Sequence, residues 1–93
     1  MEIQVRIGMR IKELRTEKNL TQEAVAWNAE VDRTFMNHVE NGRRNISVKS
    51  LEKIIVNGLQ VSLLEFFNHN LLYTILCQDK KLMMLLWQKE NVI

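Results

Sequence analysis

Two short helical patterns follow each other almost without a break in residues 21–42, TQEAVAWNAEVDRTFMNHVENG. Thr21 is typical of a helix N-cap, because its hydroxyl can accept a hydrogen bond from a backbone amide of the next turn, and it predicts a helix over residues 22–29. Asp32 is a second N-cap and predicts another helix that reaches Glu40, where an Asn-Gly pair ends it. A connection this short forces the two helices to cross steeply, which restricts the fold strongly.

The rest of the chain also favours helices. It contains no proline and three glycines, and it lacks the runs of alternating β-branched residues that are typical of strands. The 93 residues are enough for one domain, and the predicted fold class is all-α. The predicted helices cover residues 3–18, 22–29, 33–40, 48–57, 63 onward with a continuation through 76, and 80–91.

The first predicted helix has a clear apolar face. Ile3, Ile7, Ile11 and Leu14 recur at spacings of three and four residues, so they share one side of the helix. Charged residues, Arg10 among them, are expected to fill the opposite, solvent-facing side. This pattern predicts a helix that lies on the surface of the domain core.

Charge and cysteine content narrow the function. The net charge of +2 favours an anionic partner only weakly. Cys77 is the single cysteine and cannot form an internal disulfide, which fits a reducing cytoplasm. The N-terminus lacks the apolar core of a signal peptide, and no apolar run approaches the ~20 residues of a membrane span. Without a nucleophile–base pair, a metal-ligand cluster or a phosphate-binding loop, we expect a cytoplasmic, non-enzymatic protein with no membrane association, no metal and no cofactor.

Three stretches match, in order, a family of bacterial and phage regulators. With RIKELRTEKNLTQEAVA, VDRTFMNHVENGRRN and GLQVSLLEFF, the chain resembles the Cro/C1-type (XRE-like) helix-turn-helix transcriptional regulators from about Ile7 to Phe67. Within that family, DRTF followed by ENGRRNISVKSLEKI most resembles the controller proteins of restriction-modification systems. The resemblance implies a five-helix Cro/C1-repressor-like DNA-binding domain over residues 1–68, with an extra helix in a C-terminal extension over residues 69–93.

The turn between the two short helices departs from this family. It often holds a glycine there, because the chain needs a left-handed residue, whereas this sequence has Glu30. A non-glycine residue in that conformation costs about 1 kcal/mol. The fold can absorb this cost.

The second helix of the motif carries polar residues suited to reading bases in a major groove. Arg33 follows the N-cap, and its guanidinium can bond O6 and N7 of one guanine together, while Asn37, one turn later, can bond an adenine edge. Thr34 can contact a thymine methyl or a phosphate, with a locally bonded hydroxyl as an equal alternative. His38 lies one turn after Thr34 and can contact a base or a phosphate. A solvated side chain is the alternative for Arg33, and its place in the motif favours base reading.

Phosphate contacts would fix the position of the protein rather than read the sequence. Gln22 begins the first helix of the motif, where free backbone amides and the helix dipole attract a phosphate. The resemblance implies that this glutamine bonds the DNA backbone. Asn41, Arg43 and Arg44 lie at and after the end of the second helix and are expected to flank the groove.

Arg15 and Glu40 have a structural role according to the same resemblance. Their positions match an internal ion pair of the family that joins the first helix to the third. Removal of one partner of a buried pair leaves an uncompensated charge, at a cost of about 3–5 kcal/mol.

The C-terminal third predicts a protein–protein interface. Residues 82–87, LMMLLW, form an apolar run that no single helical face can bury, and such patches usually mark interfaces. The resemblance implies pairing of two copies through the fifth helix. The predicted dimer-interface residues are Leu63, Leu64, Phe67, Leu82, Leu85, Leu86 and Trp87. The alternative is that the extension folds back on its own subunit and enlarges the core.

These observations lead to a homodimeric DNA-binding transcription regulator that recognises a palindromic operator in double-stranded DNA. The resemblance implies a restriction-modification controller that acts at the promoters of its own gene and of the endonuclease gene. Activation would require a contact with RNA polymerase, for which Glu23 is a candidate. The alternatives are a phage-type repressor or an antitoxin of the same fold, and a protein-interaction module that has lost DNA binding.

Overall fold

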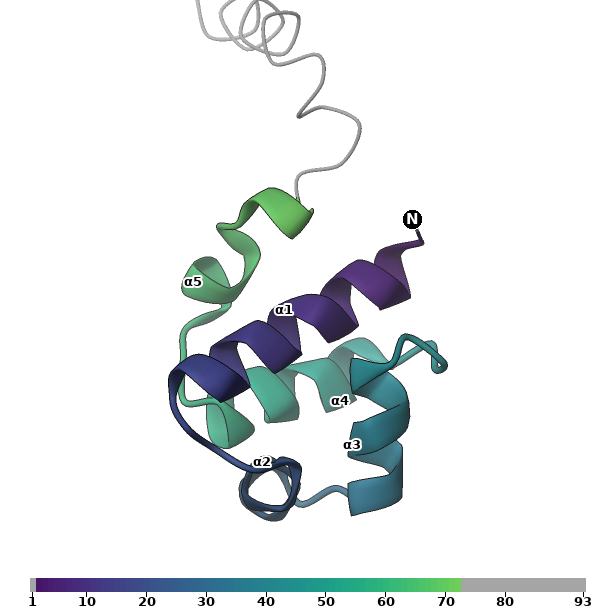
Figure 1. The fold of residues 1–93 in the computed structure, drawn as a ribbon, viewed down its shortest axis with the longest axis vertical. Helices are drawn as coiled ribbons and strands as arrows, with labels where there is room; N and C mark the ends of the chain where they lie inside the picture. Colours follow the sequence, from purple (N-terminus) through teal and green to yellow (C-terminus); the bar gives the residue numbers. More distant parts are fainter. Residues whose placement is uncertain (1, 73–93) are drawn as a thin grey trace, which may run out of the picture.

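The computed structural model describes residues 2–72, and this part of the chain is helical and has no β-strands (Figure 1). Its five α-helices confirm the predicted all-α fold class. The predicted helix over residues 80–91 lies outside the described residues. In the part that is described, no helix is both long and apolar enough to cross a membrane. The elements are α1 (Ile3–Glu17), α2 (Gln22–Ala29), α3 (Arg33–Glu40), α4 (Val48–Glu52), the π-helical segment η1 (Lys53–Gly58) that continues α4, α5 (Leu63–Phe67) and the 3-10 turn η2 (Asn70–Leu72).

Side-chain caps fix where the short helices begin. The Thr21 hydroxyl accepts a hydrogen bond from the Ala24 amide at 3.0 Å, and the Asp32 carboxylate accepts one from the Thr34 amide at 2.9 Å. The two N-caps predicted for the central motif are therefore confirmed. Ser47 and Ser62 cap α4 and α5 in the same way. Because each cap satisfies an otherwise unpaired amide, the helices start at defined residues.

The helices α1, α2, α3 and α5 and the segment η1 all contribute buried apolar residues to one core. Figure 1 places α2 and α3 on one side of α1 and α5 on the other, while α4 and η1 run beneath α1. Burial of these apolar side chains is the main stabilising term for a domain of this size. The buried apolar residues are Ile7, Ile11, Leu14, Val25, Ala26, Ala29, Met36, Val39, Ile54, Ile55, Leu59, Val61 and Phe66.

The apolar face of α1 is buried except at its start, and one prediction about this helix is wrong. Ile3 is 48% exposed, because the first turn of α1 projects beyond the elements that cover the rest of the helix (Figure 1). Arg10, expected on the solvent side, is only 6% exposed. Its guanidinium donates to the backbone oxygens of Phe66 at 2.9 Å and Glu65 at 2.8 Å, so it lies beneath the end of α5.

The predicted continuation of the fifth helix through residue 76 is also wrong over its described part. The helix ends at Phe67, and a 3-10 turn follows at Asn70–Leu72. Arg10 takes the carbonyls of Glu65 and Phe66, which a continuing helix would use for its next amides. A contact with α1 therefore replaces one further helical turn.

Candidate nucleic-acid interface

The turn between α2 and α3 has the geometry of a helix-turn-helix. Glu30 has φ 57° and ψ 43°, the left-handed conformation expected at this position. The next amide, that of Val31, donates to the Ala26 carbonyl at 2.9 Å and closes the turn. Ala26 is buried. A larger side chain at this position would force the two helices apart. Figure 1 shows α2 nearly end-on and α3 lengthwise, so the two helices cross steeply, as inferred from the sequence.

α3 presents different residues to the core and to solvent. Met36 and Val39 are buried, whereas Arg33 and Thr34 at its start are exposed. Asn37, one turn further, is half-buried and lines a shallow hollow with Gln22, Arg33 and Thr34. The structure thus brings together the predicted base-reading residues at the start of α3.

Arg33 is paired with a carboxylate from the neighbouring helix. Its Nη1 lies 2.9 Å from Oε1 of Glu23, and both side chains are about two-thirds exposed (68% and 66%). An exposed pair of this kind contributes little free energy, so Arg33 can exchange this partner for another at small cost. The same pair means that Glu23, the candidate contact for RNA polymerase, faces Arg33.

The ion pair that was expected between α1 and α3 lies behind the exposed residues at the start of α3. Arg15 Nε lies 2.6 Å from Glu40 Oε2, and Arg15 Nη2 donates to Glu40 Oε1 at 3.1 Å. The Glu40 side chain is only 1% exposed and that of Arg15 14%. Arg15 Nη1 also donates to the Leu20 carbonyl at 2.8 Å, which fixes the chain before α2. The pair therefore holds three segments together.

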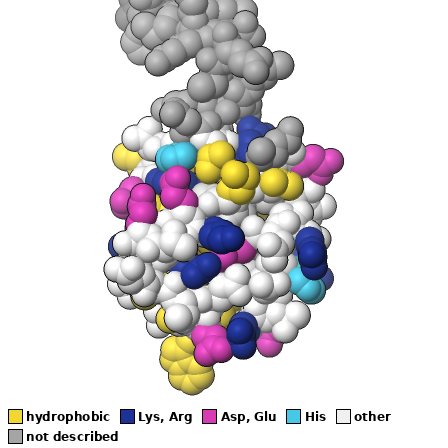
Figure 2. All heavy atoms as spheres, viewed as in Figure 1, with side chains coloured by type: hydrophobic (Ala, Val, Ile, Leu, Met, Phe, Trp, Pro, Cys, Tyr) yellow, Lys and Arg dark blue, Asp and Glu magenta, His cyan; other side chains and the backbone are white. Residues whose placement is uncertain are grey.

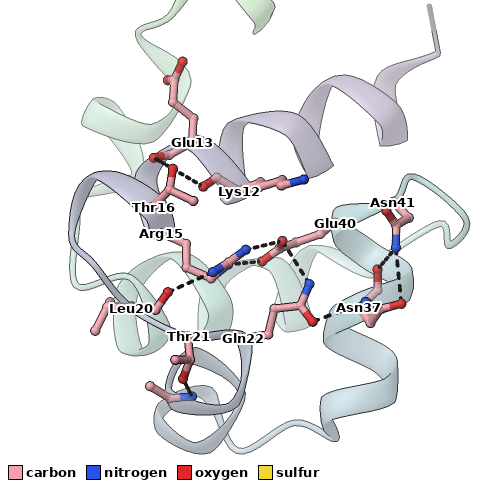
Figure 3. A network of polar contacts seen from close by, with 11 residues as sticks. Lys12, Glu13, Arg15, Thr16, Leu20, Thr21, Gln22, Asn37, Glu40 and Asn41 are labelled. Atoms are coloured by element: carbon pink, nitrogen blue, oxygen red, sulfur yellow. Dashed lines mark hydrogen bonds and ion pairs between the residues drawn. The ribbon is translucent and has the colours of Figure 1, made fainter.

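A line of side-chain amides connects this ion pair to the surface of α3 (Figure 3). Gln22 Nε2 donates to Glu40 Oε1 at 3.1 Å, and Asn37 Nδ2 donates to Gln22 Oε1 at 3.2 Å. Asn41 Nδ2 donates to the Asn37 carbonyl at 2.9 Å and to Asn37 Oδ1 at 3.2 Å. No local pattern in the sequence indicates the bonds made by Gln22, because its partners lie 15 and 18 residues away. Gln22, expected on phosphate, is thus also part of an internal network.

The segment after α3 carries the remaining basic candidates. Arg43 and Arg44 are exposed, and the Arg43 amide donates to the His38 carbonyl at 2.9 Å. The guanidinium carbon of Arg44 lies 5.2 Å from the ring centroid of Phe35, a cation–π contact that holds this arginine against α3. His38 is half-buried on α3 beside this segment.

Apolar groups are unevenly spread on the face seen in Figure 2. Lysine and arginine side chains are spread over the face, with acidic side chains among them, while hydrophobic side chains gather near the end next to the grey residues and one large hydrophobic side chain projects at the opposite end. Of the predicted dimer residues, Leu63, Leu64 and Phe67 are exposed on α5. The others, Leu82, Leu85, Leu86 and Trp87, lie outside the described residues.

Comparisons with known proteins agree with this geometry. Residues 6–62 match the model of a helix-turn-helix domain family. Over 68 residues the chain is 44% identical to control protein C.MunI of a Mycoplasma species, covering 72% of this chain and 90% of that protein. It is 39% identical over 57 residues to the immunity repressor protein of Bacillus phage phi105, covering 60% of this chain and 40% of the repressor.

A solved structure adds a nucleic-acid complex. The fold is similar to the restriction-modification controller protein C.Esp1396I, seen as a tetramer in complex with its natural 35 base-pair operator. The TM-score is 0.68 and the identity 38%, over 72% of this chain and 88% of that one. These findings confirm the resemblance seen in the sequence, and they point to a family of DNA-binding regulators rather than of enzymes. The chain therefore belongs to the helix-turn-helix family of DNA-binding transcription regulators, and within that family to the restriction-modification controllers.

Proposed function

We propose that the protein acts in the cytoplasm as a homodimer that binds a palindromic operator in double-stranded DNA at the promoters of its own gene and of the endonuclease gene. The observation that carries this proposal is the division of α3. Its apolar side is buried, while Arg33 and Thr34 at its start remain exposed beside Asn37. In a controller fold related to a protein seen on its operator, this exposed edge is the part suited to enter a major groove.

The contacts divide by their chemistry. Arg33, Thr34 and Asn37 read bases, with His38 at the edge of the same surface. The residues assigned to phosphates are Gln22, Asn41, Arg43 and Arg44. Gln22 suits this task because its backbone lies in the first turn of α2, where unpaired amides attract an anion.

Two copies are needed because one short helix buries too little surface for tight, specific binding. Leu63, Leu64 and Phe67 form an exposed apolar surface on α5, on the other side of α1 from the α2–α3 motif (Figure 1). Pairing through this surface would place two α3 helices in successive major grooves about 34 Å apart. The extension over residues 69–93 adds to this interface. Sedimentation of a chain truncated after residue 72 tests this role: a weaker dimer is expected, and an unchanged dimer would contradict it.

A binding titration tests the proposal. The wild-type protein and Arg33→Ala are titrated onto labelled DNA from directly upstream of the gene and onto unrelated DNA of equal length, at one fixed salt concentration. Wild type is expected to prefer the upstream DNA by roughly a thousandfold or more, and Arg33→Ala to lose part of that preference. Equal affinity of the wild-type protein for both DNAs would contradict the proposal and favour a module that has lost DNA binding.

The similarity to the phi105 immunity repressor supports a second candidate, a phage-type repressor with the same mode of DNA binding. The neighbouring genes discriminate between the candidates. A methyltransferase and an endonuclease gene beside this one support the controller, phage genes support the repressor, and a toxin gene supports an antitoxin.

A further inference from the structure

The buried end of the amide network can only accept hydrogen bonds. Both oxygens of the almost fully buried Glu40 side chain accept hydrogen bonds from Arg15, a side chain that can only donate, so this end of the network presents acceptors. Gln22 must therefore turn its Nε2 toward Glu40, as it does at 3.1 Å. The two ends of a glutamine amide have nearly the same shape, so hydrogen bonding rather than packing decides which end points inward.

The orientation of the Gln22 amide fixes the orientation of the Asn37 amide. With Nε2 directed at Glu40, Gln22 presents Oε1 to α3, and Oε1 accepts from Asn37 Nδ2 at 3.2 Å. At its other end, Asn37 Oδ1 accepts from Asn41 at 3.2 Å. All donors therefore run in one direction, from Asn41 through Asn37 and Gln22 to Glu40 (Figure 3).

The direction decides what Asn37 can offer to DNA. One hydrogen on Nδ2 and one lone pair on Oδ1 are left after these bonds. An adenine presents the matching pair on its major-groove edge, an acceptor at N7 and a donor at N6. A reversed Asn37 amide would exchange its donor and acceptor and would not match adenine in the same position.

We propose that Glu40 is a positioning residue for base recognition, which acts through Gln22 to fix the orientation of the Asn37 amide for one adenine in each half-site. The inference rests on the proposed function, because it requires Asn37 to lie in the groove. The simpler role of Glu40, holding α1 to α3 with Arg15, predicts a different effect. Its loss would then weaken binding to all DNA sequences alike.

The hydrogen bonds of the network, and their dependence on Glu40, can be tested in the free protein. NMR is expected to show the side-chain amide hydrogens of Gln22 and Asn37 exchanging with water more slowly than those of Asn28 and Asn57, which are exposed. In Glu40→Gln, whose amide can either donate or accept, the slow exchange at Gln22 and Asn37 is expected to change toward the faster exchange of the exposed residues. Equal exchange at all four side chains in the wild-type protein would overturn the proposal.

A specificity measurement tests the consequence. Each base pair of a half-site is changed in turn, and the affinity ratio is measured for wild type, Asn37→Ala and Glu40→Gln. Glu40→Gln is expected to lose roughly tenfold discrimination at the same A·T pair as Asn37→Ala and to keep the other ratios. Equal weakening on every operator would overturn the proposal in favour of the structural role.

A second variant covers the case in which Glu40→Gln does not fold. Arg15→Met combined with Glu40→Met removes the pair without stranding a charge, a change that is often neutral for stability. It removes the acceptor at the end of the network, so it is expected to lose the same discrimination. Retained discrimination at that A·T pair would overturn the proposal. A wild-type protein without any operator preference would instead overturn the proposed function, which the NMR exchange does not measure.

Discussion

Single residues at the proposed DNA-binding edge differ in how tightly they are held before DNA arrives. Arg33 is exposed and pairs with an exposed carboxylate, so it can change partner at small cost. Asn37 is bonded at both ends of its amide, and Arg44 rests on the Phe35 ring. We expect the held residues to contribute geometric selectivity and Arg33 to contribute the larger share of discrimination.

Arg33 and Arg43 are a matched pair for separating base reading from phosphate binding. Arg33→Ala is expected to lower the preference for a guanine by about 1–3 kcal/mol at one base pair per half-site, because alanine cannot form the bidentate hydrogen bonds. Arg43→Ala is expected to weaken binding uniformly and to reduce the slope of log affinity against log salt by about one for each phosphate that is no longer neutralised. Titrations on operator variants at several salt concentrations measure both, and a reversal of the two patterns would contradict the assignments.

At the level of elements, close backbone contact joins α1 to the end of α3. A Cβ added at Gly8 would lie 2.4 Å from the Val39 carbonyl oxygen and 2.7 Å from that of Glu40. Both are backbone atoms, so the two helices would have to separate. The glycine is thus explained by packing, although an isolated helix would favour alanine there.

Gly8→Ala is therefore expected to destabilise the protein by about 1–3 kcal/mol, the usual cost of overpacking, instead of stabilising it. Urea denaturation measures this change in the free energy of unfolding. Lys12→Ala, at an exposed position of the same helix, is the control and is expected to stay within about 0.5 kcal/mol of wild type. A gain in stability for Gly8→Ala would show that α1 and α3 do not approach as closely as described.

The ion pair between the same two helices gives a second test at this scale. Arg15→Met alone would leave the Glu40 carboxylate buried without its cation, and we expect a loss of about 3–5 kcal/mol. The double replacement of Arg15 and Glu40 by methionine is expected to recover most of that loss. Thermal unfolding of both variants measures the difference, and equal stability of the two would contradict a buried, mutually dependent pair.

The elements also show what could be predicted from the sequence. The caps at Thr21 and Asp32 depend on neighbouring residues, and both were predicted correctly. The left-handed Glu30 was expected from the resemblance to the family, and the structure confirms it. The burial of Arg10 and the end of the fifth helix were not predicted, because Arg10 donates to carbonyls 55 and 56 residues away. No local pattern carries information about a partner at that distance.

The candidate site divides in the same way. The residues at the start of α3 follow from the position of the N-cap. Their hydrogen-bond network could not be predicted, since it depends on how α1, α2 and α3 meet in space. The assignment of each predicted DNA contact to a base or a phosphate stays a prediction.

At the level of the whole molecule, we propose that DNA binding and pairing of two copies use different sides of α1. Leu64 is 80% exposed on α5 and contributes little to the core, and Val48 on α4 is similarly exposed at 85%. Leu64→Lys is expected to weaken dimerisation by at least tenfold in sedimentation experiments without loss of thermal stability, since it places a charge in the proposed interface. Val48→Lys is the matched control, and equal effects of the two changes would place the interface elsewhere.

The central claim is that two copies of α3 read DNA together, and hydroxyl-radical footprinting of the DNA upstream of the gene tests it most directly. We expect two protected segments related by a two-fold axis and spaced by about 10 base pairs, one helical turn. Arg33→Ala is expected to weaken the protection of both segments to the same extent. A single protected segment, or protection that does not depend on the DNA sequence, would contradict the claim.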